Sequence, residues 1–188
     1  LDARACSTVL LDASVSGALL YASLGVVADG QALVFQNDSP KPFTNLPEGV
    51  SRLCEKDVPT LVEFDTLIFG AGRADVFKAY LADLTDRAFV ARDARGNITG
   101  FVFAQSNRIG PWVAKDQDTA DKLIRAALSV GYKPLVRILV PSRNGSGGDL
   151  LTRYGFQFYR AQTHMRRGKA YPARQRELIY GQASFAIG

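Results

Sequence analysis

The sequence predicts a mixed α/β (α+β) fold, in which a central sheet is flanked by helices and is preceded by the tail of a second domain. Three observations carry this prediction. Strand-like and helix-like segments alternate in the second half of the chain, a proline-containing polar passage divides the chain, and a segment near the N-terminus recurs near the C-terminus. Strands and helices that alternate after a hairpin indicate a sheet with helices on both of its faces.

The first unit is expected over residues 1–36. Residues 7–11 read as an apolar strand, and residues 15–25 as a helix that ends at Gly25, because glycine favours the left-handed conformation of a C-terminal cap. Residues 26–35 are strand-like, with a hairpin turn expected at Asp29-Gly30. Residues 37–49 contain three prolines and small polar residues, so we place a linker there.

The second unit is expected over residues 50–188, and it begins with a strand at 50–54. Two helices follow, one over 59–69 and one marked by apolar residues between 77 and 84. Later strands are expected over 88–91, 98–105, 109–114 and 135–140, with a helix over 144–154. Two strands at 156–160 and 163–167 and a β segment over 178–187 complete the order.

Composition narrows the function classes. Apolar residues make up 47% of the 188 residues and charged residues 22%, which are ordinary globular values. The net charge is +5 without a run of basic residues, so no nucleic-acid partner is expected. No apolar run approaches the ~18 residues of a membrane span. The cysteines Cys6 and Cys54 form no C-x-x-C pair, which favours a reducing, cytoplasmic location, and no metal-ligand spacing is present. The chain begins at Leu1 and its single methionine is Met165, which favours a fragment or a processed chain.

The stretch from Ile109 to Leu128 is where the sequence would place an anion. A short strand runs through a polar loop into a helix whose apolar residues recur at i, i+3, i+4 and i+7. Thr119 is the expected N-cap. The first turn of a helix offers free N–H groups and the positive end of the helix dipole, so phosphate groups bind there.

The N-terminal helix and the helix at 144–154 match when Ser14 is set beside Asn144, 130 residues later. Gly17 then meets Gly147, and Gly25 meets Gly155. Both copies are an apolar strand, a polar turn, a short helix and a glycine before an apolar residue. The first residues of the chain therefore read as the end of an earlier copy of the later domain.

These segments resemble the GNAT superfamily of N-acetyltransferases, through the helix endings LLYASLGV and LLTRYGF before the last strands. The second unit looks like the C-terminal domain of tandem-GNAT proteins, with Gly110-Pro111-Trp112 in its fourth strand. The resemblance implies transfer of acetyl from acetyl-CoA to an amine of a small molecule or peptide, with no membrane partner. A homodimer is compatible with the sequence.

The resemblance also implies site residues. The family binds the acetyl-CoA pyrophosphate on a loop of the type Gln/Arg-x-x-Gly-x-Gly/Ala, which corresponds to residues 114–120 here, so the cofactor contacts would be Lys115, Thr119, Ala120 and, on a later loop, Asn144. This loop lacks glycine and contains two aspartates, which argues against a cofactor in the second unit. The family's proton-donating tyrosine corresponds to Leu151 in the second unit and to Tyr21 in the first, so Tyr21 is the expected catalytic acid.

Other interpretations remain open. The second unit could instead be a non-catalytic ligand-binding or dimerisation module, or an acetyltransferase that uses an unusual loop. Tyr21 could be an ordinary helix aromatic, Asn144 a helix cap without function, and His164 a structural residue rather than a base. The aromatic residues Phe103, Trp112 and Tyr132 could line an acceptor pocket, although core positions suit them better.

Overall fold

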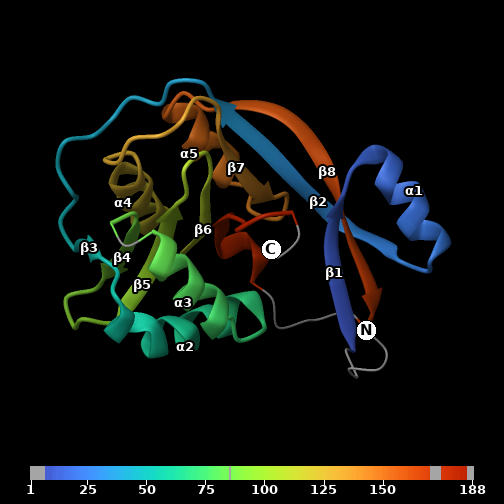
Figure 1. Cartoon of the computed structure of the whole chain (residues 1–188), viewed down its shortest axis with the longest axis horizontal. Coiled ribbons are helices and arrows are strands. Elements are labelled where there is room, and N and C mark those ends of the chain that lie inside the picture. The colour runs from blue at the N-terminus through green and yellow to red at the C-terminus, as the bar shows by residue number, and fades with distance from the viewer. Residues whose placement is uncertain (1–6, 85, 170–174, 186–188) are drawn as a thin grey trace.

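The computed structural model describes residues 7–84, 86–169 and 175–185, which form two sheets surrounded by helices (Figure 1). The larger sheet has the order β3-β4-β5-β6-β9, and all its neighbouring strands are antiparallel. Its strands are β3 (Val50–Arg52), β4 (Ala88–Arg92), β5 (Ile98–Ala104), β6 (Ile109–Ala114) and β9 (Ile179–Gly181).

Helices cover both faces of this sheet, as the sequence predicts. Helices α2 (Val58–Phe69) and α3 (Ala74–Asp83) share one apolar core with Phe101 and Phe103 of β5. Helix α4 (Gln117–Ala127) shares the opposite core with Trp112. Phe103 and Trp112 are fully buried in these cores, and Tyr132 packs against the second one. They are therefore core residues and line no acceptor pocket.

The smaller sheet combines strands from both ends of the chain in the order β1-β8-β2-β7. Its strands are β1 (Thr8–Ala13), β2 (Val27–Asn37), β7 (Val136–Pro141) and β8 (Gln157–Gly168). Helix α1 (Val15–Ser23) connects β1 to β2, and helix α5 (Gly147–Arg153) connects β7 to β8. Two short 3-10 turns, η2 (Glu55–Asp57) and η3 (Arg176–Leu178), complete the described elements.

The two repeated segments adopt the same local structure. The amide of Gly17 donates to Ser14 Oγ at 3.1 Å, and the amide of Gly147 donates to Asn144 Oδ1 at 2.9 Å. The two helices are followed by glycines with φ of 74° and 77°, Gly25 and Gly155. The β2–β8 ladder is symmetric about the Ala32–Gln162 pair, with one irregularity on each side. The strands that follow the two repeated helices, β2 and β8, thus pair with each other in one sheet.

Several predicted boundaries are wrong. No hairpin forms at Asp29-Gly30, because β2 runs through this point and its ladder with β8 absorbs the extra residue as a bulge. The two strands expected after Gly155 are one continuous strand, β8. Helix α5 begins at Gly147 rather than Asn144. The β segment expected over 178–187 is limited to β9, because Leu178 belongs to a 3-10 turn and residues 182–185 are not strand; residues 186–188 lie outside the described residues.

Candidate functional site at the head of helix α4

The head of helix α4 is capped by a carboxylate. Asp116, in extended conformation after β6, accepts a 2.7 Å hydrogen bond from the amide of Thr119 through its Oδ1. Asp116 is therefore the N-cap, and the expectation that Thr119 fills this position is wrong. Thr119 is the third residue of the helix, and its side chain is nearly buried. The Asp116 carboxylate reaches back to a free amide of the first turn, which is the favoured N-cap geometry.

The predicted cofactor contacts at this head do not form an anion cradle. The amide of Thr119 is occupied by Asp116, and the amide of Ala120 donates to the carbonyl oxygen of Asp116 at 3.0 Å. Asp118 adds a second negative charge to the first turn, and the basic residue of this loop is the exposed Lys115, which precedes Asp116. A pyrophosphate would meet two carboxylates where it needs free N–H groups. The residues present do not fit that group.

The edge of β6 next to this head is occupied by the C-terminal segment. Strand β9 pairs with β6 through Trp112↔Gly181 and Val113↔Ile179, and it also lies against β7. The amide of Gln182 donates to the carbonyl oxygen of Leu139 in β7 at 2.8 Å. Strand β9 therefore closes the gap between β6 and β7.

Two residues singled out in the sequence hold this segment in place. Asn144 is buried; its Nδ2 donates to the carbonyl oxygen of Ile179 at 3.0 Å, while its Oδ1 accepts from Gly147. Gly110, in the Gly-Pro-Trp motif, has a φ of 145°, and a Cβ there would collide with the carbonyl oxygen of Gln182. Asn144 thus links β9 to the first residue of α5, whose N-cap is Ser146, and its polar atoms are used in the fold.

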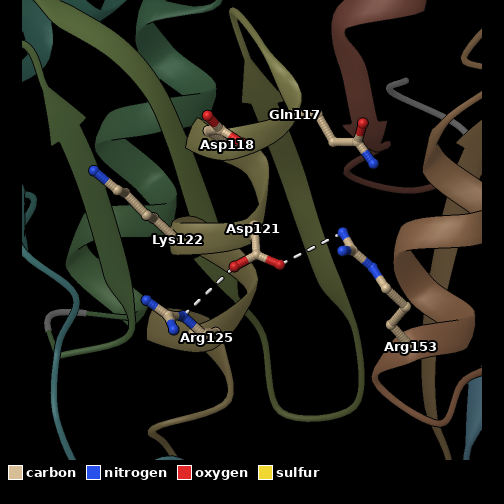
Figure 2. Close-up of a pocket in the computed structure, with 6 residues that line it drawn as sticks. All are labelled: Gln117, Asp118, Asp121, Lys122, Arg125 and Arg153. Atoms are coloured by element: carbon tan, nitrogen blue, oxygen red, sulfur yellow. Dashed lines mark ion pairs between the residues drawn. The ribbon is translucent and has the colours of Figure 1, made fainter.

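An open polar pocket of about 480 Å³ lies beside the first turns of α4 and faces Arg153 of α5 (Figure 2). Asp121 is at its centre, 3.7 Å from Arg125 Nε and 3.6 Å from Arg153 Nη2. Asp121 also accepts a 2.8 Å hydrogen bond from the hydroxyl of Tyr154. Burial, together with this hydrogen bond and the charge of Asp121, raises the pKa of Tyr154 well above its ordinary value, so the hydroxyl stays protonated. Asp121 thus partly neutralises both arginines.

Tyr21 lies far from these groups. It is half-buried on α1, where it packs with Ala13, Val26 and Met165. Helices α1 and α4 lie at opposite sides of the molecule (Figure 1). The structure brings Lys115, Thr119 and Ala120 together at one helix head, with Asn144 beside β9, but it does not bring Tyr21 to them.

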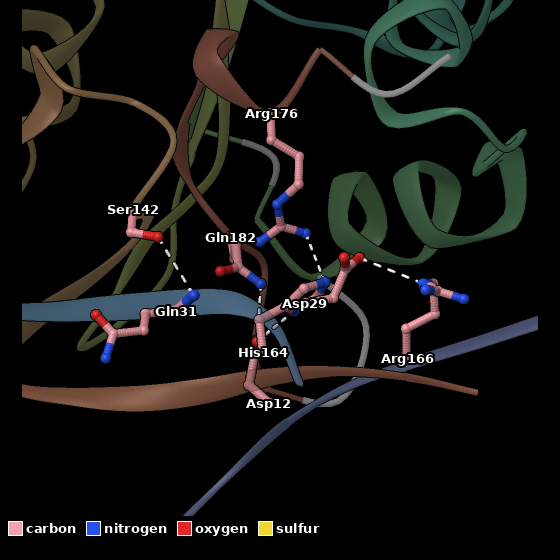
Figure 3. Close-up of polar contacts among 8 residues, drawn as sticks. All are labelled: Asp12, Asp29, Gln31, Ser142, His164, Arg166, Arg176 and Gln182. Atoms are coloured by element: carbon pink, nitrogen blue, oxygen red, sulfur yellow. Dashed lines mark hydrogen bonds and ion pairs between the residues drawn. The ribbon is translucent and has the colours of Figure 1, made fainter. Parts of the chain in front are cut away.

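A buried polar cluster on the shared sheet was not predicted from the sequence (Figure 3). His164 Nδ1 lies 2.7 Å from Asp12 Oδ1, and His164 Nε2 lies 2.9 Å from Arg176 Nη1. Gln182 Nε2 donates to the second oxygen of Asp12 at 2.8 Å. Burial lowers the pKa of Arg176, and the charges of Asp12 and Asp29 oppose this shift. All four side chains of the cluster are at most 8% exposed.

The partners of His164 define its chemistry. Arginine has only donors, so Nε2 must accept from Arg176, and Nδ1 therefore carries the proton that is donated to Asp12. Neither ring nitrogen is free to take a proton from a substrate, and the structural role of His164 is favoured over that of a general base. Sequence reasoning missed the cluster because Asp12 and His164 are 152 positions apart and meet only through the β1–β8 pairing.

Comparison with known protein families identifies the type of domain to which these residues belong. The model of the acetyltransferase (GNAT) domain family matches residues 61–181, which is more than half of the chain. The chain belongs to the GNAT acetyltransferase family. No curated protein sequence matches this GNAT chain. Within the described residues, no helix is long and apolar enough to cross a membrane, and no group of three His, Cys, Asp or Glu is placed to hold a metal.

Solved structures share the fold of the GNAT chain. A protein from Pyrococcus horikoshii that was assigned as an acetyltransferase matches with a TM-score of 0.80 and 24% identity, over 97% of this chain and 60% of that one. A GCN5-related N-acetyltransferase from Sphaerobacter thermophilus matches with a TM-score of 0.60 and 19% identity, over 89% and 62%. One from Kribbella flavida matches with a TM-score of 0.55 and 18% identity, over 92% and 46%. The GNAT chain thus spans less than two thirds of the length of each.

Proposed function

We propose that this chain is the second unit of a two-unit GNAT N-acetyltransferase, which transfers acetyl from acetyl-CoA to an amine of a small molecule or peptide. In this proposal the second unit holds no acetyl-CoA of its own. The cofactor is bound by a preceding unit, of which residues 1–36 form the end, and residues 37–49 join the two.

The proposal rests mainly on the contacts made at the N-terminal end of helix α4. Asp116 occupies the amide of Thr119 at 2.7 Å, and β9 occupies the edge of β6 that begins beside this head. A pyrophosphate bound in the second unit would need free N–H groups at this head. The repeated structure of β1-α1-β2 and β7-α5-β8 supports a second unit of the same kind, and the longer GNAT structures leave room for it.

The contribution of the described residues to the chemistry would be Tyr21. Its phenol hydroxyl would donate a proton to the departing thiolate, which is the role of a general acid. Attack by the amine itself would depend mainly on the orientation of the two substrates. The position equivalent to Tyr21 in the second unit is Leu151, which has no proton to donate.

Calorimetric titration with acetyl-CoA tests the proposal. The 188-residue chain is expected to give no binding heat, whereas a longer form that includes the preceding unit is expected to bind. Asp116→Ala is expected to leave binding by the longer form unchanged, because the α4 head takes no part in it. Tight binding by the 188-residue chain, abolished by a charge at the α4 head such as the exposed Gln117→Glu, would contradict the proposal and favour a working site in residues 50–188.

Turnover of the longer form tests Tyr21. Tyr21→Phe removes only the hydroxyl and is expected to lower kcat by about 10²-fold or more with little change in KM, as for loss of a general acid. Tyr159→Phe is the matched control, since Tyr159 is half-exposed on β8. Equal activity of the two variants would leave Tyr21 as an ordinary packing residue.

The second candidate function is a non-catalytic ligand-binding module. The pocket in Figure 2 favours it, because Lys122, Arg125 and Arg153 there belong to no part of the acetyl-transfer proposal. A module of this kind would bind a polar anionic ligand in the 188-residue chain and would show no acetyl transfer in any longer form.

A further inference from the structure

Helix α1 has the apolar composition of a buried helix, but within the described part of the chain it buries none of its residues. Its nine residues, Val15–Ser23, include no charged residue and no buried one. We define the α1 face as the exposed apolar residues of this helix and its C-terminal end, with Leu19 at 76%, Leu20 at 61% and Val15, Leu24 and Val27 at 50–84% exposure. A helix at a protein surface normally carries polar residues on its outer side, and one that is apolar all round is normally buried.

Helix α5 shows what covers a helix of this kind. It repeats α1, with the same capping hydrogen bond and the same terminal glycine. Leu150, the counterpart of Leu20, is fully buried in one core with Leu123 and Ile124 of α4 and Trp112 of β6. The cover of α5 is therefore an α/β layer, composed of β3–β6 with α4, that precedes α5 in the chain.

We propose that a second α/β layer, equivalent to β3–β6 with α4, packs against the α1 face. This layer is contributed by polypeptide that precedes residue 1 in a longer form of the protein. The proposal rests on the two-unit arrangement of the proposed function and names the surface through which the units join. The internal repeat identifies the layer that would cover α1, because within the described residues the equivalent helix, α5, is covered by a layer of this kind.

Two further observations fit this occupant. Strand β1 lies at the edge of the shared sheet, next to the α1 face, while the opposite edge strand, β7, lies against β9 of the larger sheet. An edge strand beside an apolar face favours pairing with further chain. In addition, about two fifths of the length of the GNAT structures from Pyrococcus horikoshii and Sphaerobacter thermophilus lies outside the match. That length is sufficient for one such layer.

The test compares one substitution in two lengths of the protein. Leu20→Asp is expected to leave the urea midpoint of the 188-residue chain unchanged and to lower that of the longer form, because only there would it bury a carboxylate. Hydrogen exchange is expected to show weakly protected α1 amides in the 188-residue chain and strongly protected ones in the longer form. Leu67→Asp is the matched control, since Leu67 is a 70% exposed leucine on α2 and is expected to be neutral in both.

Two outcomes would overturn the proposal. If Leu20→Asp were neutral in the longer form and its α1 amides were unprotected, the α1 face would be an open surface. If the 188-residue chain formed a concentration-dependent dimer in sedimentation, and Leu20→Asp dispersed it, the occupant would be a second copy. Protection of α1 in a longer form that binds no acetyl-CoA would leave this surface assigned and would contradict only the proposed function.

Discussion

The units β1-α1-β2 and β7-α5-β8 have the same local structure in unlike surroundings. Ser14 and Asn144 cap equivalent amides, and Gly25 and Gly155 end the two helices with nearly equal φ. Yet α1 has no buried residue, whereas α5 buries Gly147, Leu150 and Leu151. The glycines therefore follow helices that end at equivalent positions, although α1 begins two residues earlier in the repeat than α5, and burial depends on whether a second layer packs against the helix.

Equivalent positions of β8 and β2 have unlike partners on the outer strands of the shared sheet. The repeat pairs His164 with Val34, and their partners on the outer strands are Asp12 and Leu139. On one side the pair is polar and bonded to Arg176 and Gln182, and on the other it is apolar and fully buried.

The largest expected effect comes from this polar pair. Asp12→Ala would leave His164 Nδ1 and Gln182 Nε2 without an acceptor and would leave Asp29 as the remaining carboxylate that acts on Arg176, so we expect a loss of about 4 kcal/mol in the free energy of unfolding. Urea unfolding measures it. The double variant with His164→Ala should cost much less than the sum of the two single variants, since the groups act as one network. Additive losses would show that the cluster is a set of independent contacts.

The next largest loss of stability is expected from one of the two equivalent leucines, Leu150 of α5 and Leu20 of α1. Leu150→Ala should cost about 3 kcal/mol, because it opens a cavity in a packed core. Leu20→Ala should change the stability of the 188-residue chain by less than about 0.5 kcal/mol, because its side chain is mostly in solvent. Thermal or urea unfolding of the two variants compares them directly. Similar losses would mean that α1 packs against something within the 188 residues.

Sequence reasoning predicted the elements better than their partners. Helices α2 and α4 and strands β4–β6 follow from apolar periodicity and turn residues close to them in sequence. The bulge that replaces the expected hairpin at Asp29-Gly30 depends on β8, more than 120 residues later. The same holds for the Asp12–His164 pair and for the contact of Asn144 with Ile179. At the α4 head the sequence indicated repulsion of phosphate by two aspartates, but it did not show that one of them is the N-cap.

A smaller effect is expected from the two capping residues. Asn144→Ala removes the cap of Gly147 and also leaves the carbonyl oxygen of Ile179 without its buried donor, so we expect a loss of about 2 kcal/mol. Ser14→Ala removes only an exposed cap and should cost about 1 kcal/mol. Equal losses in urea unfolding would show that the contact between Asn144 and β9 adds nothing to stability.

The smallest losses in the free energy of unfolding are expected at the glycines that follow the two helices, and these losses should be nearly equal. Gly25 and Gly155 both have positive φ, where an L side chain is disfavoured by about 1 kcal/mol whatever surrounds it. A Cβ at Gly25 would meet nothing within 4 Å, and one at Gly155 would lie 3.3 Å from Asn37 Nδ2, at the end of a side chain that can shift. Gly25→Ala and Gly155→Ala are therefore expected to cost about 1 kcal/mol each in urea unfolding. Gly131→Ala, at an open position without positive φ, should cost less than either. If Gly155→Ala cost several times more than Gly25→Ala, the surroundings would affect the helix ends as well, and the equivalence of the two units would be limited to their backbone.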